Sequence, residues 1–194
     1  MIKLVIFDLD GTITQPHLDF RKIREEMGIT VEKMSILDFL DSLDGEEKRR
    51  ADAILDAHEK DAAYKSKLSS GARELFDYLR EKNIRIAIMT RNARENVLIV
   101  LEKHKLSVDE ILTREDGPVK PSPEGVFALC GKFDVTPGET LMAGDFLFDI
   151  QTGKNAGTRT ILLKWQDTTG WPVQADYEVS TLAEIIPIIE KLNE

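Results

Sequence analysis

The stretch L-V-I-F-D-L-D-G-T at residues 4–12 decides how this chain folds. Its apolar half is uninterrupted, which indicates a strand that is covered on both faces of a parallel sheet. Asp8 and Asp10 follow at the end of that strand, and Gly11-Thr12 turns the chain away. Because ligands of parallel sheets bind beyond the carboxyl ends of the strands, we expect both carboxylates in a binding crevice. An ordinary strand-ending turn uses the same residue types, so the rest of the chain has to decide between these interpretations.

The composition excludes several classes of protein. The chain has 194 residues, of which 42% are hydrophobic and 31% charged, as expected for one large domain or a core domain with a small insertion. A net charge of −9 argues against nucleic-acid and anionic-membrane partners. No apolar run approaches the roughly 20 residues of a membrane span, and no signal peptide is expected before the first strand. Cys130 is the single cysteine, which favours a reducing, cytoplasmic location and a core position for its thiol.

A long region with helical patterning separates the first strand from a regular alternation of helices and strands. The expected helices cover residues 19–27, 35–43, 45–67, 72–82, 93–105 and 182–192, and the further expected strands cover 84–89, 110–112, 139–143 and 160–164. Ser35 is the expected N-cap of the second helix, and Ser122 and Pro123 are the expected N-cap and first residue of another. The charged surface of the helix over 45–67 is interpreted as solvated.

Alternation of this kind predicts an α/β fold with a parallel sheet flanked by helices. The helical block after the first strand is an insertion, placed where it would cover the strand ends. We therefore predict a core domain from residues 1–14 and 70–194 and a small α-helical cap domain from residues 15–69.

Further polar groups follow the other strands of the predicted sheet. They are Thr90 after the second strand, Lys120 in the loop G-P-V-K-P-S-P, and Asp145 and Asp149 after the strand that ends at residue 143. Alone, each is an ordinary helix cap, loop lysine or turn residue. Together with the first two aspartates they predict a phosphoryl-transfer site. Clustered carboxylates favour Mg²⁺, and the threonine and lysine supply donors for a phosphate group.

With these motifs in order, the chain resembles the haloacid dehalogenase superfamily of phosphotransferases. D-L-D-G-T at residues 8–12 looks like its first motif, I-M-T at 88–90 its second, K-P-S-P at 120–123 its third, and the segment 144–149 its fourth. Residues 175–184 resemble its C-terminal strand and helix. The helices at 15–69 resemble the small cap of the phosphoglycolate phosphatase and β-phosphoglucomutase branch. The resemblance implies a Rossmann-like core.

The resemblance also implies catalytic and phosphate-binding roles. Asp8 would attack phosphorus and carry the phosphoryl group. Asp10 would protonate the leaving oxygen and then activate water. Thr90 and Lys120 would hold the phosphoryl oxygens.

The metal site implied by the resemblance holds Mg²⁺. Asp8 and Asp145 would supply carboxylate oxygens, and Asp10 would supply its backbone carbonyl. Asp149 would be either a direct ligand or a partner of the ligands.

The function implied is that of a magnesium-dependent phosphatase acting on a small phosphate ester, either phosphoglycolate-like or a sugar phosphate. One alternative is a phosphomutase, which would protect the same phosphoaspartate from water. A second alternative is a non-catalytic phosphate-binding protein on this fold. The resemblance is compatible with a monomer.

Residues outside the motifs give weaker signals. His17, Arg21, Arg49 and Arg50 are candidate substrate contacts from the cap, although each is also typical of an ordinary surface. His58 and His104 are interpreted as solvated, and Trp165 and Trp171 as packing residues beside the loop 166–170.

Overall fold

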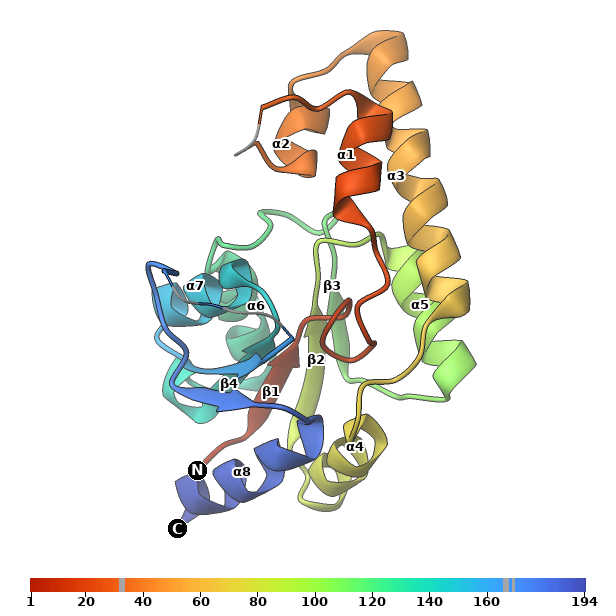
Figure 1. Cartoon of the computed structure of the whole chain (residues 1–194). Coiled ribbons are helices and arrows are strands. Elements are labelled where there is room, and N and C mark those ends of the chain that lie inside the picture. The colour runs from red at the N-terminus through yellow and green to blue at the C-terminus, as the bar shows by residue number, and fades with distance from the viewer. Residues whose placement is uncertain (32–33, 166–167, 169) are drawn as a thin grey trace.

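The structure, a computed structural model, describes residues 1–31, 34–165, 168 and 170–194. Its centre is a six-stranded sheet with the order β3-β2-β1-β4-β5-β6 (Figure 1). Every neighbouring pair is parallel, as the sequence predicts. The strands are β1 (Leu4–Phe7), β2 (Arg85–Met89), β3 (Glu110–Leu112), β4 (Thr140–Gly144), β5 (Arg159–Leu163) and β6 (Tyr177–Val179).

Helices cover both faces of the sheet. They are α4 (Ala72–Glu81), α5 (Arg94–His104), α6 (Glu124–Phe133), α7 (Leu147–Ala156) and α8 (Ile185–Asn193), with short 3₁₀ helices at Pro137–Glu139 and Leu182–Glu184. Val5 and Phe7 of β1 belong to one apolar cluster with residues of α4, α5 and α8. Leu4 and Ile6 belong to another cluster with residues of α6 and α7. This alternation explains why the whole first strand is apolar, since each of its faces is buried.

The helices that follow β1 form a separate group. α1 (Phe20–Met27), α2 (Ile36–Asp41) and α3 (Gly45–Lys65) lie beyond the carboxyl end of β1 (Figure 1). Ile23, Leu40 and Leu55 belong to an apolar cluster of their own, distinct from the two clusters of the sheet. The helical content of this region agrees with the sequence, and Ser35 caps α2 by accepting from the backbone N–H of Asp38 at 3.1 Å. The domain boundaries at residues 14 and 70 stay a prediction.

Two local expectations were inexact. α6 begins at Glu124, one residue later than the sequence predicts, so Pro123 takes the N-cap position. The Ser122 hydroxyl still accepts from the backbone N–H of Glu124 at 3.3 Å, which explains the signal in the sequence. The helix α7 was not predicted, because its Thr152 and Gly153 have low helix preference. It is capped by Asp149, which accepts from the backbone N–H of Phe146 at 3.0 Å.

Two expectations from composition bear on the core and the surface. Cys130 of α6 is buried in the apolar cluster that includes Leu4 and Ile6, and its sulfur lies 3.5 Å from the Thr140 hydroxyl. Its core position is therefore confirmed. Within the described ranges, none of the helices is both long and apolar enough to cross a membrane.

One of the buried leucines of α4 gives a test of this packing. Leu79 is fully buried, whereas Leu98 on α5 is 50% exposed. Replacing Leu79 with alanine leaves a cavity against the sheet and should lower the free energy of unfolding by about 2–5 kcal/mol. Leu98→Ala is the control, with an expected loss below about 1 kcal/mol. Urea unfolding measures both, and similar midpoints for the two variants would contradict the packing described.

Candidate active site

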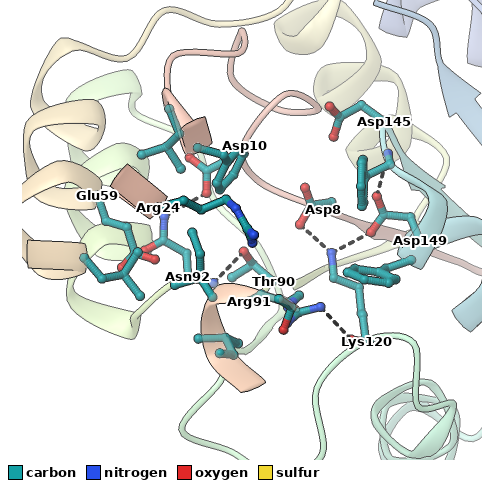
Figure 2. A pocket seen from close by; sticks show the side chains of 18 of the residues that line it. Asp8, Asp10, Arg24, Glu59, Thr90, Arg91, Asn92, Lys120, Asp145 and Asp149 are labelled. Atoms are coloured by element: carbon teal, nitrogen blue, oxygen red, sulfur yellow. Dashed lines mark hydrogen bonds and ion pairs between the residues drawn. The ribbon is translucent and has the colours of Figure 1, made fainter. Parts of the chain in front are cut away.

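The residues predicted for the site line one cavity of about 440 Å³ (Figure 2). They are Asp8 and Asp10 after β1, Thr90 after β2, Lys120 between β3 and α6, Asp145 after β4 and Asp149 in the first turn of α7. Since β1 pairs with both β2 and β4, the central strand brings its two aspartates between the groups that follow its neighbours.

Lys120 makes the closest contacts between charged groups in the cavity. Its Nζ lies 2.5 Å from Oδ1 of Asp8 and 2.6 Å from Oδ1 of Asp149. All three residues are nearly inaccessible, with Lys120 only 3% exposed. Burial alone would lower the pKa of Lys120, but the charges of Asp149 and Asp8 raise it above its ordinary value. The lysine is therefore a fixed positive charge at the position of the predicted nucleophile.

Three carboxylates form a group that fits a divalent cation. Asp8, Asp145 and Asp149 each offer an oxygen, and these oxygens all lie within 4.8 Å of one another. Burial raises the pKa of Asp8 to about 7, against the attraction of Lys120. Burial also raises the pKa of Asp145 to about 8, and the charges of Asp8 and Asp149 add to this rise. One lysine does not balance three carboxylates, and oxygen-only donors suit Mg²⁺.

Two glycines allow the backbone to approach these carboxylates. Gly11 has φ +85°, and a Cβ there would lie 2.2 Å from a carboxylate oxygen of Asp145. A Cβ on Gly144 would lie 2.2 Å from the side chain of Asp149. Any larger residue at either position would displace a carboxylate, which explains the glycines in both aspartate motifs.

Asp10 lies in different surroundings from Asp8. Its Oδ2 accepts a hydrogen bond of 2.7 Å from the side-chain amide of Asn92. Burial raises the pKa of Asp10, although the Asn92 hydrogen bond and the charge of Lys120 oppose the rise. The indole N–H of Trp165 donates to the carbonyl of Gly11 and holds the turn that follows. A carboxyl group that resists ionisation and is held in one orientation suits proton transfer.

The side of the cavity that is predicted to bind phosphate contains Thr90 and an arginine that the sequence did not single out. The Thr90 hydroxyl accepts from the backbone N–H of Asn92 at 3.1 Å, and a hydroxyl that accepts there can still donate its own proton. The guanidinium of Arg91 stacks 4.7 Å from the ring centroid of Phe148. It also donates to the Ser35 hydroxyl at 3.1 Å and so connects the loop after β2 with the helical insertion.

The outer part of the cavity is mainly apolar. Its apolar lining residues are Leu18, Phe20, Met34, Ile36, Leu37, Leu55, Phe146 and Phe148. The ring of Phe146 packs edge-on against those of Phe148 and Trp171, with ring centroids 5.3 and 5.9 Å apart, respectively. Trp171 is thus a packing residue, as expected, while most of the loop 166–170 lies outside the described residues.

The candidate contacts from the helical insertion do not reach the cavity. His17, Arg21, Arg49 and Arg50 are exposed and absent from its lining, which agrees with their interpretation as surface residues. The polar residues of this insertion that do line the cavity are Arg24, Ser35 and Glu59, and Glu59 of α3 is only 5% exposed. The interpretation of α3 as a solvated charged helix is therefore wrong at this residue.

The two histidines interpreted as solvated are also partnered. His58 Nε2 lies 2.8 Å from a carboxylate oxygen of Glu26, and His104 Nε2 lies 2.9 Å from the Ser66 hydroxyl. Both contacts join residues far apart in the chain, which helical periodicity does not reveal. Neither histidine lines the cavity.

Comparisons with known proteins agree on one family. The family model for haloacid dehalogenase-like hydrolases matches residues 2–157. A haloacid dehalogenase-like hydrolase domain-containing protein of Arabidopsis thaliana is 31% identical, over 96% of this chain and 83% of that protein. The pyrophosphatase PpaX of Bacillus mycoides is 33% identical, over 62% of this chain and 59% of that protein. The structure of a predicted phosphoglycolate phosphatase from Haemophilus somnus has a TM-score of 0.74 and 20% identity, with 97% of this chain and 98% of that one covered.

The carboxylate group can be tested for metal binding without an activity assay. Mg²⁺ at about 100 times its dissociation constant should stabilise the folded protein by about 2.7 kcal/mol, measured as a rise in melting temperature. Asp145→Asn replaces a charged carboxylate ligand with a neutral amide and should abolish most of that rise. Asp52→Asn, at an exposed position of α3, is the matched control and should keep it. Equal stabilisation of wild type and Asp145→Asn by Mg²⁺ would contradict the proposed metal site.

Proposed function

Because the chain belongs to the haloacid dehalogenase-like hydrolase family, we propose that it is a magnesium-dependent phosphatase that hydrolyses a small phosphorylated metabolite through an aspartyl-phosphate on Asp8. The observation that carries the proposal is the placement of Lys120. Its ammonium group contacts Asp8 and Asp149 within a cluster of three carboxylates. This arrangement supplies a nucleophile, a fixed positive charge and the ligands of a cation at one point.

In the first step a carboxylate oxygen of Asp8 attacks phosphorus. The new bond joins that oxygen to phosphorus, and the bond from phosphorus to the leaving oxygen breaks. Asp10 donates its proton to the leaving oxygen, which departs as an alcohol. Lys120 and Thr90 hold the phosphoryl oxygens and stabilise the charge that they carry. Mg²⁺, when bound by the carboxylates, would neutralise part of the charge of the nucleophile and the phosphoryl group.

In the second step Asp10 acts as a base. It has lost its proton in the first step, so it can accept a proton from water while the water oxygen attacks phosphorus. The bond between phosphorus and Asp8 breaks, which releases inorganic phosphate and restores the Asp8 carboxylate. Asp10 is protonated again and ready for another cycle. The hydrogen bond from Asn92 supports the second step, because an amide N–H stabilises the ionised carboxylate that forms between the steps.

The lining of the cavity supports an organic leaving group. The phosphoryl site is charged, whereas the walls beyond it are mainly apolar, with Phe20, Leu55 and Phe148 among them. An organic ester buries apolar surface there, and inorganic pyrophosphate does not. The lining also includes polar side chains, among them Arg24, Ser35 and Glu59, so a sugar phosphate stays an alternative to an ester with more apolar parts.

Hydrolysis of p-nitrophenyl phosphate tests the proposed function. We expect Mg²⁺-dependent release of phosphate by the wild type and a loss of at least about 10³-fold in Asp8→Asn, because the amide cannot form the phosphoenzyme. Circular dichroism checks that the variant is folded. A phosphomutase would instead retain the phosphoenzyme and return the group to a sugar phosphate. Full activity in Asp8→Asn, after removal of contaminating phosphatases, would refute the aspartyl-phosphate.

Metal exchange gives a second test of the same site. Excess chelator should abolish hydrolysis, and added Mg²⁺ should restore it. Ca²⁺ should support much less turnover, because it prefers more ligands at longer distances and in looser geometry. Phosphate release at each metal concentration is the measurement. Undiminished turnover in excess chelator would exclude a role for the carboxylate cluster as a metal site.

A further inference from the structure

A chain of hydrogen bonds connects Asp10 to the helical insertion. Asn92, in the loop before α5, donates to Oδ2 of Asp10 at 2.7 Å. Asn96, one turn further along α5, donates from Nδ2 to Oδ1 of Asn92 at 2.9 Å and to Oε2 of Glu59 at 3.3 Å. Glu59 belongs to α3 and accepts from the guanidinium of Arg114 at 2.7 and 2.8 Å. Asp10, Asn92 and Glu59 lie on the side of the cavity away from Lys120 (Figure 2).

The members of this chain are buried to a degree that is costly for polar groups. Asn92 is 4% exposed, Asn96 is fully buried and Glu59 is 5% exposed. Among the described residues, Oδ1 of Asn96 has no hydrogen-bond partner. A buried polar atom without a partner costs about 1–3 kcal/mol. Apolar side chains would fill the same space without this cost, so packing alone does not account for the amides.

The contacts determine which way the amide of Asn92 faces. Its Oδ1 accepts from the backbone N–H of Ala93 at 2.7 Å as well as from Asn96. With two donors on the oxygen, the amide nitrogen must face Asp10. A turned amide would place its oxygen against the carboxylate and its nitrogen against the two donors. The orientation of Asn96 is in turn set by Glu59, which takes the second hydrogen of the Asn96 amide.

We propose that Asn92, Asn96 and Glu59 are positioning residues that hold the Asp10 carboxyl in the orientation for proton transfer and make that orientation depend on the seating of α3. This inference rests on the proposed role of Asp10 as acid and base. The hydrogen bond from Asn92 occupies Oδ2, so Oδ1 is the oxygen that carries the transferable proton. Displacement of α3 withdraws Glu59, releases Asn96 and frees the Asn92 amide to turn. The acid is thereby correctly aligned only while the insertion is in place over the site.

Leaving-group dependence separates this role from a merely structural one. p-Nitrophenolate leaves readily without a proton, whereas phenolate is a stronger base and depends on the general acid. Asn96→Ala should therefore lower kcat/KM for phenyl phosphate about tenfold more than for p-nitrophenyl phosphate, since misalignment of an acid is costly where the acid is needed. Glu59→Gln should shift the same ratio in the same direction, because its amide turns a donor toward Arg114 or Asn96. Thermal unfolding is measured in parallel.

The matched control lies between the same two helices. Glu95 of α5 pairs with Lys60 of α3 at 2.6 Å on the surface, and Glu95→Gln weakens that contact without touching the chain. We expect an unchanged ratio of the two esters in this variant. If Asn96→Ala and Glu59→Gln lower kcat/KM by the same factor for both esters, the ratio stays at its wild-type value. That result would show a structural role and overturn the proposal.

A crystal structure of Asn96→Ala, or of Glu59→Gln if the first variant does not fold, gives a readout that is independent of turnover. We expect the Asn92 amide to be turned and its contact of 2.7 Å with Asp10 to be lost. Retention of that contact would overturn the proposal. Failure of the wild type to hydrolyse either ester would count against the proposed function and leave a substrate-strict phosphatase, a phosphomutase or a binding protein. The geometry of the variant would still decide whether the chain orients Asp10.

Discussion

The ion pairs of Lys120 with Asp8 and Asp149 are the interaction on which the rest of the site depends. Buried carboxylates are tolerated only with a partner, and one lysine serves two of them here. Its position is possible because β1 lies at the centre of the sheet, between β2 and β4. The loop before α6 then places the ammonium group of Lys120 against these two carboxylates. Asp145 adds a third carboxylate to this cluster, which would favour a second cation, so the sheet order and the proposed metal site have a common origin.

The two aspartates of the first motif are only one residue apart, yet they lie in different environments. Asp8 faces the ammonium group of Lys120, which opposes the rise in pKa that burial causes and so favours the carboxylate form. Asp10 faces the neutral amide of Asn92, and burial favours its protonated form. Two carboxyl groups with different partners can perform nucleophilic and acid-base roles in one cavity. The proposed division of roles would follow from which loop lies opposite each side chain.

The sequence was sufficient to predict the parallel sheet, the helical insertion and six of the polar residues that line the cavity, because each of these follows from a strand and what lies at its end. Glu59, Arg91 and Asn96 were not predicted. Their contacts join α3, α5 and the loops after β2 and β3, and no local pattern encodes which of many charged or amide side chains will meet. The error about α3 has the same cause: its charged surface is mostly exposed, and the single buried acid is distinguished by tertiary contacts alone. The helix α7 was missed because packing against the sheet, rather than residue preference, stabilises it.

The separate apolar cluster of α1, α2 and α3 has a consequence for how such a protein can diversify. Ile23, Leu40, Ala51 and Leu55 pack among themselves and not into the clusters of the sheet. Mutations that reshape this cluster therefore leave the core of the sheet intact, and with it the strand ends that carry the reactive groups. The helices of the insertion can therefore change in sequence while the residues at the strand ends stay the same. Within α3, Glu59 restricts such changes, because a substitution that removes its contact with Asn96 would also disturb the orientation of Asp10.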